Sequence, residues 1–427
     1  MSSGNQSFTR TSKIVGTTAV GMLIALTTTT AYAAPTPAPV AAVKNTACAP
    51  EEGVTPTTIK LGFVTPKTGA AAANFAGAWQ AAQLRLDQEN ARGGVNGRKL
   101  SLTVYDDASS SSTQTTVATK ALQDDHVFAL SAATSVDAMY PQLKSANVPI
   151  TGFTNAPYAT DRNAFSVTGV SSPSYSVTTA FDRMKQDGST KFANINHATP
   201  GATNSSNGYS KLIPLVSGIS ETLRIADEPQ GAHDATSTAL RIKSSGSDGA
   251  YFNMYVDGGI SIIQAMKAQG VNLKATYLVG LSDPAIVAKA ASSLEGVIGS
   301  GYGTVPIGVN NRAVKTYAAG MKSAGLNPYT ASAPVGFLDE DLIISGLKKI
   351  GNCPTRAALI NYLRGVTNYT GGGMLPQPIS FGPGVTPNGN PVNCTWFTVV
   401  KGSQLVPDAK VTCGKLVNNQ TGEVIKS

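Results

Sequence analysis

The chain has 427 residues, of which 41% are hydrophobic and 14% charged, and its formal charge at pH 7 is +8. This length is sufficient for two domains of ordinary size, each with its own hydrophobic core. The lysines and arginines are scattered and have no aromatic residues interleaved with them, which indicates a solvated basic surface and argues against a nucleic-acid-binding protein.

The first residues have the features of a secretory signal peptide. Arg10 and Lys13 precede an apolar run over 14–26, and Ala31-Tyr32-Ala33 is a small-residue cleavage signal. The run is too short and too rich in threonine to favour a membrane span. We therefore expect an exported protein whose signal peptide, residues 1–33, is cleaved after Ala33.

The next predicted elements are a tail and a β-α-β unit. Residues 34–53 begin with a Pro/Ala/Val-rich stretch without periodicity, which predicts a flexible tail. Alternating apolar residues predict a strand over 58–65, and apolar residues at helical spacing predict a helix over 76–90. Glycines end this helix, and a second strand follows over 100–107. This order of elements opens a parallel sheet.

The same strand and helix order resembles the opening of the branched-chain amino acid binding proteins, which are type I periplasmic solute-binding proteins of ABC importers. The match continues through a strand over 127–130, a helix over 135–145 and the strand Val148-Pro-Ile-Thr151. The resemblance covers about 58–410. It implies an α/β fold with two lobes, each a mostly parallel sheet flanked by helices.

The resemblance also implies that the chain crosses between the lobes three times, and we expect the crossings near Thr168, Tyr302 and Gly372. The first lobe is then 54–168 with 303–372, and the second is 169–302 with 373–415. A C-terminal tail, 416–427, follows.

The second half of the chain continues the alternation of strands and helices. The predicted strands are 191–196, 223–227, 249–254, 275–279 and 296–301. The predicted helices are 208–219, 236–244, 259–269, 286–293, 311–324, 332–350 and 355–365. A hairpin over 394–412 ends the pattern.

Four cysteines in an exported chain predict two disulfides. We favour Cys353 with Cys394 and Cys48 with Cys413, because the terminal extensions then become fastened and each long loop restricts the unfolded chain. The alternative is a local pair of Cys394 with Cys413 across the last hairpin. The sequence does not decide between them.

No pattern of catalytic or metal-binding residues is visible. The three histidines, His126, His197 and His233, have no second ligand four residues away and no cysteine nearby. The pair Asp106-Asp107 at a strand end is interpreted as a solvated turn. We therefore expect no enzyme activity, no metal and no cofactor.

Ligands in open α/β sheets bind beyond the carboxyl ends of the strands, where helix N-termini face the crevice. Thr134-Ser-Val-Asp137 has the pattern of a capping box, so Thr134 and Ser135 could cap a helix, contact a ligand, or do both. The resemblance implies that residues matching Ala133 or Thr134, and those matching Phe153 and Asn155, hold a ligand carboxylate. The candidates from the first lobe are Ala133, Thr134, Ser135, Phe153, Thr154 and Asn155.

The resemblance places aromatic or acidic residues at three strand ends of the second lobe, here 197–204, 254–257 and 281–283. The candidates are Tyr255, Ser282, Asp283 and Tyr302. The two tyrosines could equally be packing residues.

The function implied is that of the extracytoplasmic substrate-binding component of an ABC importer, which closes two lobes around a small carboxylate-bearing ligand. Its expected partners are this ligand and the permease subunits, and the expected state is a monomer. The alternative is a ligand-sensing receptor subunit of the same fold.

Amino acid binders of the family hold the ligand ammonium with an acidic residue of the second lobe. When this strand end is matched to the family, the acidic position falls best on Leu281 or Ser282. Asp283 occupies it only if the match is shifted by one or two residues. We therefore favour an apolar or aromatic carboxylate without an amine, with an amino acid as the alternative.

Overall fold

A computed structural model describes residues 48–153 and 155–426. The predicted signal peptide and residues 34–47 of the predicted tail lie outside the described residues, as does the site candidate Thr154.

The first sheet confirms the predicted β-α-β unit. Its strand order is β2-β1-β3-β4-β5, and all four pairings are parallel. The strands are β1 (Thr58–Thr65), β2 (Lys99–Asp106), β3 (Ala129–Ala132), β4 (Ile150–Gly152) and β5 (Ala164–Ser166). Two helices connect the first three strands, α1 (Ala78–Ala91) and α2 (Ser111–Gln123).

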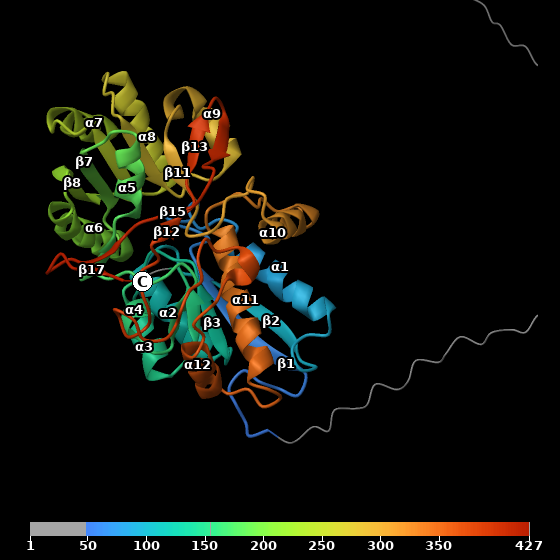
Figure 1. The fold of residues 1–427 in the computed structure, drawn as a ribbon. Coiled ribbons are helices and arrows are strands. Elements are labelled where there is room, and N and C mark those ends of the chain that lie inside the picture. Colours follow the sequence, from blue (N-terminus) through green and yellow to red (C-terminus); the bar gives the residue numbers. More distant parts are fainter. Residues whose placement is uncertain (1–47, 154, 427) are drawn as a thin grey trace, which may run out of the picture. The chain divides into compact units, whose positions relative to one another are not determined.

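Helices from much later in the chain complete the core on this sheet. They are α10 (Arg312–Ser323), α11 (Ala333–Lys349) and α12 (Arg356–Arg364). Their apolar faces share a buried cluster with Ile59 and Leu61 of β1. In Figure 1 these helices, in orange and brown, therefore pack against the blue and teal strands of the first sheet. Val64 of the same strand belongs to a different cluster, shared with residues of α2 and β3. The strand is thus buried on both faces, as is usual for parallel sheets.

The second sheet has seven strands in the order β14-β13-β11-β10-β9-β7-β8. Five are parallel: β7 (Lys191–His197), β8 (Ser220–Glu228), β9 (Gly249–Asn253), β10 (Ala275–Val279) and β11 (Ile298–Ser300). The hairpin of β13 (Thr398–Lys401) and β14 (Gln404–Pro407) adds an antiparallel edge. The helices between the parallel strands are α6 (Pro200–Leu212), α7 (Ala235–Ser244), α8 (Val256–Ala268) and α9 (Pro284–Leu294), and α5 (Thr179–Gln186) precedes β7.

The predicted C-terminal tail, 416–427, instead contributes two strands. β16 (Leu416–Asn418) pairs with β6 (Tyr175–Val177) and with β17 (Val424–Ile425). Leu416 and Val417 are buried, which explains why this segment is held. The remaining short elements are α3 (Tyr140–Ser145), α4 (Pro157–Thr160), the 3-10 turns η1 (Ile213–Leu215) and η2 (Gly371–Gly373), and the pair β12 (Cys394–Thr395) and β15 (Thr412–Cys413).

Two helix predictions are wrong in position. The helix expected over 208–219 is α6, which begins at Pro200 because the Thr199 hydroxyl caps it, accepting a hydrogen bond from the Ala202 N–H. The capping box expected at Thr134 opens no helix there, since α3 begins at Tyr140. The Thr134 hydroxyl instead donates to Asp107.

Asp107 is fully buried, so its assignment to a solvated turn is also wrong. Besides Thr134, its carboxylate accepts hydrogen bonds from the backbone N–H of Ser109 at 3.0 Å and from Gln114 at 3.3 Å. Burial raises the pKa of Asp107, and these donors oppose the rise. These hydrogen bonds make Asp107 a structural residue that fixes the conformation of the loop after β2.

The favoured disulfide pairing is wrong, and the local alternative is confirmed for one bond. Cys394 pairs with Cys413 between β12 and β15, while Cys48 pairs with Cys353 in the loop between α11 and α12. The N-terminal extension is therefore fastened to the first sheet's helices. The bond closes a sequence separation of 305 residues.

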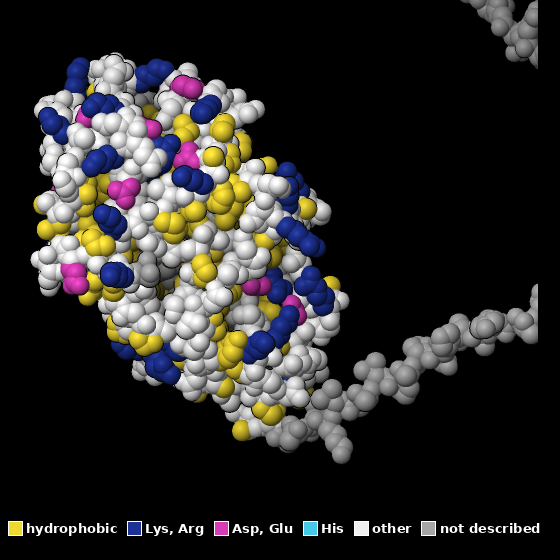
Figure 2. Space-filling view, in the orientation of Figure 1, with side chains coloured by type: hydrophobic (Ala, Val, Ile, Leu, Met, Phe, Trp, Pro, Cys, Tyr) yellow, Lys and Arg dark blue, Asp and Glu magenta, His cyan; other side chains and the backbone are white. Residues whose placement is uncertain are grey.

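Between Cys48 and Lys426, residue 154 excepted, no helix is long and apolar enough to cross a membrane. Lysine and arginine side chains are spread over the face shown in Figure 2 and are separated by uncharged groups. This distribution agrees with a solvated basic surface.

Candidate functional site

A cavity of about 120 Å³ lies where the carboxyl ends of strands from both sheets meet. Segments after β1, β3 and β4 supply one wall, and segments after β7, β9, β10 and β11 supply the other. The lining residues are Asn74, Phe75, Thr134, Ser135, Phe153 and Asn155 on the first side, and His197, Thr199, Gly201, Ala202, Ser205, Asn253, Met254, Tyr255, Val279 and Tyr302 on the second. A cavity of ~150 Å³ accepts a ligand as large as benzene, so this space suits a small molecule.

Aromatic rings form a continuous part of the wall. The ring centroid of Phe153 lies 4.7 Å from that of Tyr302 and 5.8 Å from that of Phe75, both in edge-to-face geometry. Phe75 in turn meets Tyr255 at 6.4 Å, and Tyr255 meets the ring of His197 at 4.7 Å. Such a wall favours apolar or aromatic parts of a ligand.

Tyr302 is held from both sides of the cavity. Its hydroxyl donates to the side-chain oxygen of Asn74 at 2.7 Å. Gly280 approaches it so closely that an added Cβ would lie 2.9 Å from the hydroxyl oxygen. Burial raises the pKa of Tyr302, so it is a neutral hydrogen-bond donor at pH 7.

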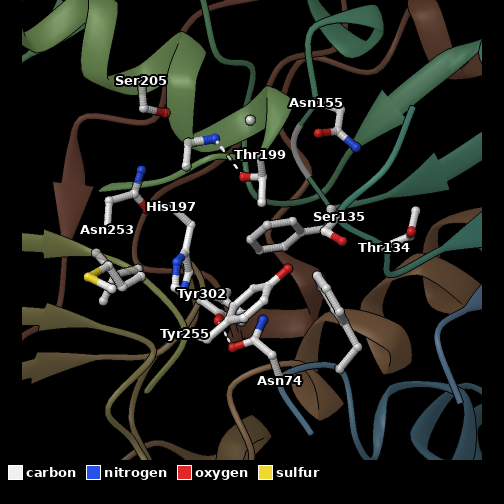
Figure 3. Close-up of a pocket in the computed structure, with 16 residues that line it drawn as sticks. Asn74, Thr134, Ser135, Asn155, His197, Thr199, Ser205, Asn253, Tyr255 and Tyr302 are labelled. Atoms are coloured by element: carbon white, nitrogen blue, oxygen red, sulfur yellow. Dashed lines mark hydrogen bonds between the residues drawn. The ribbon is translucent and has the colours of Figure 1, made fainter. Parts of the chain in front are cut away.

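Two hydrogen-bonding groups on the first wall lack partners among the described residues. These are the hydroxyl oxygen of Ser135 and the amide nitrogen of Asn155, both buried. Figure 3 shows Thr134, Ser135 and Asn155 on one side of the cavity, opposite His197 and Asn253. A buried polar group without a partner is costly, and a ligand oxygen could satisfy it.

Tyr255 stands opposite Ser135. Burial raises the pKa of Tyr255 to about 12. The Tyr255 hydroxyl donates to Gln230 at 3.2 Å. The phenol is therefore neutral and already has one partner.

Two helices begin at the cavity. α6 starts after its cap Thr199 and places Gly201, Ala202 and Ser205 in the wall, and α8 starts directly after Tyr255. Each helix has 13 residues, long enough for its N-terminus to carry a partial positive charge. This arrangement favours an anionic group in the cavity.

Among the described residues that line the cavity there is no aspartate, glutamate, lysine or arginine, and His197 is the one basic side chain. No cluster of three or more potential metal ligands occurs within the described parts of the chain. The chemistry of the cavity is thus that of hydrogen bonding, aromatic contact and helix termini.

The structure brings together most of the site residues predicted from sequence. Thr134, Ser135, Phe153, Asn155, Tyr255 and Tyr302 all line the cavity. Ala133 is buried just behind the wall, in a cluster with Phe75 and Tyr255.

Ser282 and Asp283 line a neighbouring cavity of about 100 Å³ instead. The Ser282 hydroxyl donates to the Tyr329 carbonyl at 2.8 Å. Asp283 caps α9 through the Ala285 N–H at 2.8 Å and accepts from Asn327 at 2.7 Å. Both carboxylate oxygens of Asp283 are therefore occupied.

The sequence analysis missed Asn74, Phe75 and Asn253. It located the strand end 197–204 but did not select His197 and Thr199, which line the cavity, as site candidates. The pair Thr199-Pro200 was a usable signal, because a threonine before a proline is typical of a helix start. No local pattern marks Asn74 or Phe75, which the loop after β1 brings to the cavity.

Comparison with known proteins agrees with this geometry. The family described as periplasmic binding protein matches residues 58–404. The chain belongs to this family. No curated protein sequence matches it closely enough to count as a relative.

Several solved structures share the fold at low sequence identity. A fatty acid ABC transporter substrate-binding protein from Thermomonospora curvata is 19% identical, with a TM-score of 0.73 over 86% of this chain and 95% of that one. The leucine-binding protein LivK from Thermotoga maritima is 17% identical, with a TM-score of 0.69 over 83% and 99%. An R. palustris solute-binding protein, solved with benzoate, is 18% identical, with a TM-score of 0.67 over 87% and 98%.

Proposed function

We propose that the protein is the extracytoplasmic substrate-binding component of an ABC importer and binds a small carboxylate-bearing ligand in the cavity between the two sheets. Membership of the periplasmic binding protein family supports this role. The observation that carries it is the combination of unpartnered groups on Ser135 and Asn155 with two helix N-termini at one cavity. A carboxylate accepts strong hydrogen bonds from hydroxyl and amide donors and is stabilised at helix N-termini.

The preferred ligand is an apolar or aromatic carboxylate without an amine. An ammonium group enclosed in the cavity would need a carboxylate partner, and the described lining residues supply none. Asp283, the candidate partner from sequence, is committed to capping α9 and to Asn327. The benzoate complex of the R. palustris protein and the fatty acid protein from T. curvata are consistent with a ligand of this class.

The mechanism is hinge closure between two lobes, the first comprising 54–168 and 303–372 and the second comprising 169–302 and 373–415. The cavity has walls from both sheets, so a ligand contacts both lobes only when they are closed. Binding then shifts the populations of open and closed states. The closed monomer delivers the ligand to permease subunits, and no catalytic step takes part.

The proposed role requires the protein to be exported from the cytoplasm. The signal peptide, residues 1–33, is cleaved after Ala33, and the two disulfides form in an oxidising compartment.

A thermal-shift panel of matched pairs tests the ligand class. The pairs are phenylalanine with 3-phenylpropanoate and leucine with 4-methylpentanoate, and benzoate is measured alone. We expect the deaminated acids to raise the melting temperature as their concentration exceeds the dissociation constant. Stabilisation by phenylalanine or leucine that disappears on deamination would reject our ligand class, and loss of that stabilisation in Asp283→Asn would assign Asp283 to the ammonium.

Small-angle scattering tests the hinge. We expect the radius of gyration to decrease when the best ligand of the panel is added at saturation. Identical scattering curves with and without a ligand proven to bind would contradict the closure mechanism.

A further inference from the structure

Of the described side chains in the cavity wall, His197 is the one that can gain a positive charge near neutral pH. The other described lining residues are uncharged, and Tyr255 and Tyr302 among them stay neutral because burial raises their pKa. A carboxylate closed into this space would meet hydrogen-bond donors and helix ends but no full positive charge. An enclosed anion without a counter-charge is costly.

The surroundings of His197 leave one nitrogen available for a proton. Nδ1 lies 3.1 Å from the carbonyl oxygen of Glu228. Because a carbonyl only accepts, Nδ1 carries the hydrogen in this contact. Nε2 is buried and has no hydrogen-bond partner among the described residues, so in the neutral ring it holds a free lone pair.

Several groups face this ring. The first turn of α8 brings Gly258 against its edge, and the His233 ring lies close by, since a Cβ added to Gly258 would be 3.4 Å from Nε2 of His197 and 3.4 Å from Cε1 of His233. Tyr255 covers one face of the His197 ring. Burial lowers the pKa of His197, and the His233 side chain lowers it further. The Glu228 carbonyl contact and the carboxylates of Asp257 and Glu228 oppose this change. The histidine is therefore mainly neutral at pH 7 when the cavity holds no anion.

We propose that enclosing a carboxylate in this cavity drives uptake of one proton from solvent onto Nε2 of His197. This inference rests on the proposed function. The ligand enters as an anion above pH 6, and the imidazolium that forms supplies the missing counter-charge. No covalent bond forms or breaks except the N–H bond at Nε2. The receptor thus loads its ligand together with a proton.

The sign of the pH dependence follows directly. The bound state holds one more proton than the free state, so affinity must rise as pH falls between the bound-state and free-state pKa of His197. A single proton can change the dissociation constant by at most about tenfold per pH unit. Asp107 is another titratable group beside the wall, through Thr134, and it needs a control of its own.

The chain contains only three histidines, which makes the test direct. NMR of 13C-labelled imidazole groups, with and without saturating 3-phenylpropanoate, follows each ring from pH 5 to 8. We expect the pKa of His197 to rise on binding, while the ring signals of exposed His126, which contacts Glu52, do not respond to the ligand. A His197 ring that stays neutral down to pH 6 in the complex would overturn the proposal.

Calorimetry in buffers of different ionisation enthalpy counts the protons. We expect uptake approaching one proton at pH 7 in the wild type, in His126→Gln and in Asp107→Asn, and none in His197→Gln. Affinity that is independent of pH, or that weakens as pH falls from 8 to 6, would also overturn it. If no carboxylate of the panel binds at any pH, the proposed function fails and the inference fails with it.

Discussion

Replacing Glu340 by glutamine should stabilise the protein, and the gain should grow with pH. Glu340 and its neighbour Asp339 lie in the middle of α11, and both are fully buried. None of their four carboxylate oxygens has a hydrogen-bond partner among the described residues. Burial raises the pKa of Glu340 to about 8, and burial together with the charge of Glu340 raises that of Asp339.

The sign and size follow from proton linkage. The folded protein holds the Glu340 proton up to a pH of about 8, whereas the unfolded chain releases it near pH 4.5. The stability contributed by this proton is complete below pH 4.5 and is lost as pH rises towards 8. Each unit of pKa difference corresponds to about 1.4 kcal/mol. After allowance for relaxation around a charged carboxylate, we expect a gain of about 2 kcal/mol in Glu340→Gln at pH 8 and almost none at pH 4.5.

The assay is urea unfolding followed by tryptophan fluorescence at both pH values. The next residue in the helix provides a matched control, because Asp341 pairs with Arg85 at 2.8 Å and accepts from Tyr369 at 3.1 Å. Asp341→Asn should lower the free energy of unfolding, by about 1 kcal/mol. A Glu340→Gln variant with the same advantage at pH 4.5 and at pH 8, or with none at either, would refute the reasoning.

Two further predictions concern stability. Removing the Cys48–Cys353 disulfide should cost more than removing Cys394–Cys413, about 6 against about 3 kcal/mol in the loop-entropy model, because the separations are 305 and 19 residues. Urea unfolding of the two double-serine variants measures the difference, and equal losses would contradict it. Gly280→Ala should lower both stability and carboxylate affinity, since its φ is +83° and its Cβ would meet the Tyr302 hydroxyl. Gly270→Ala, with φ +65° and open space, should cost only backbone strain and leave affinity unchanged, so equal effects in both variants would exclude the contact.

The sequence predicted most strands of the two sheets because most are short apolar runs bounded by turn residues, but it did not predict β5, which has three residues. β1 and β10 lie where their apolar residues indicate. The errors arose where a local pattern competed with tertiary contacts. The start of α6 was placed too late because its first turn, after Pro200, is polar and carries no apolar periodicity.

The cavity could be predicted only in part. Residues such as Asn155 and Tyr255 follow directly after strands, so the strand ends located them. Asn74 comes from a loop whose path no local pattern fixes. The cysteine pairing was equally undetermined, because it depends on Cys48 lying beside the loop that holds Cys353.

The most direct test of the binding site is the affinity of the best carboxylate for Asn155→Leu, measured by isothermal titration calorimetry. Asn155 is almost completely buried, and its amide nitrogen has no partner within the described chain. Asn310→Leu makes the same substitution at an exposed position and serves as the control. We predict that Asn155→Leu weakens binding by about 2 kcal/mol, or roughly thirty-fold, while Asn310→Leu binds as the wild type does. Equal affinities for all three proteins would show that the ligand binds elsewhere.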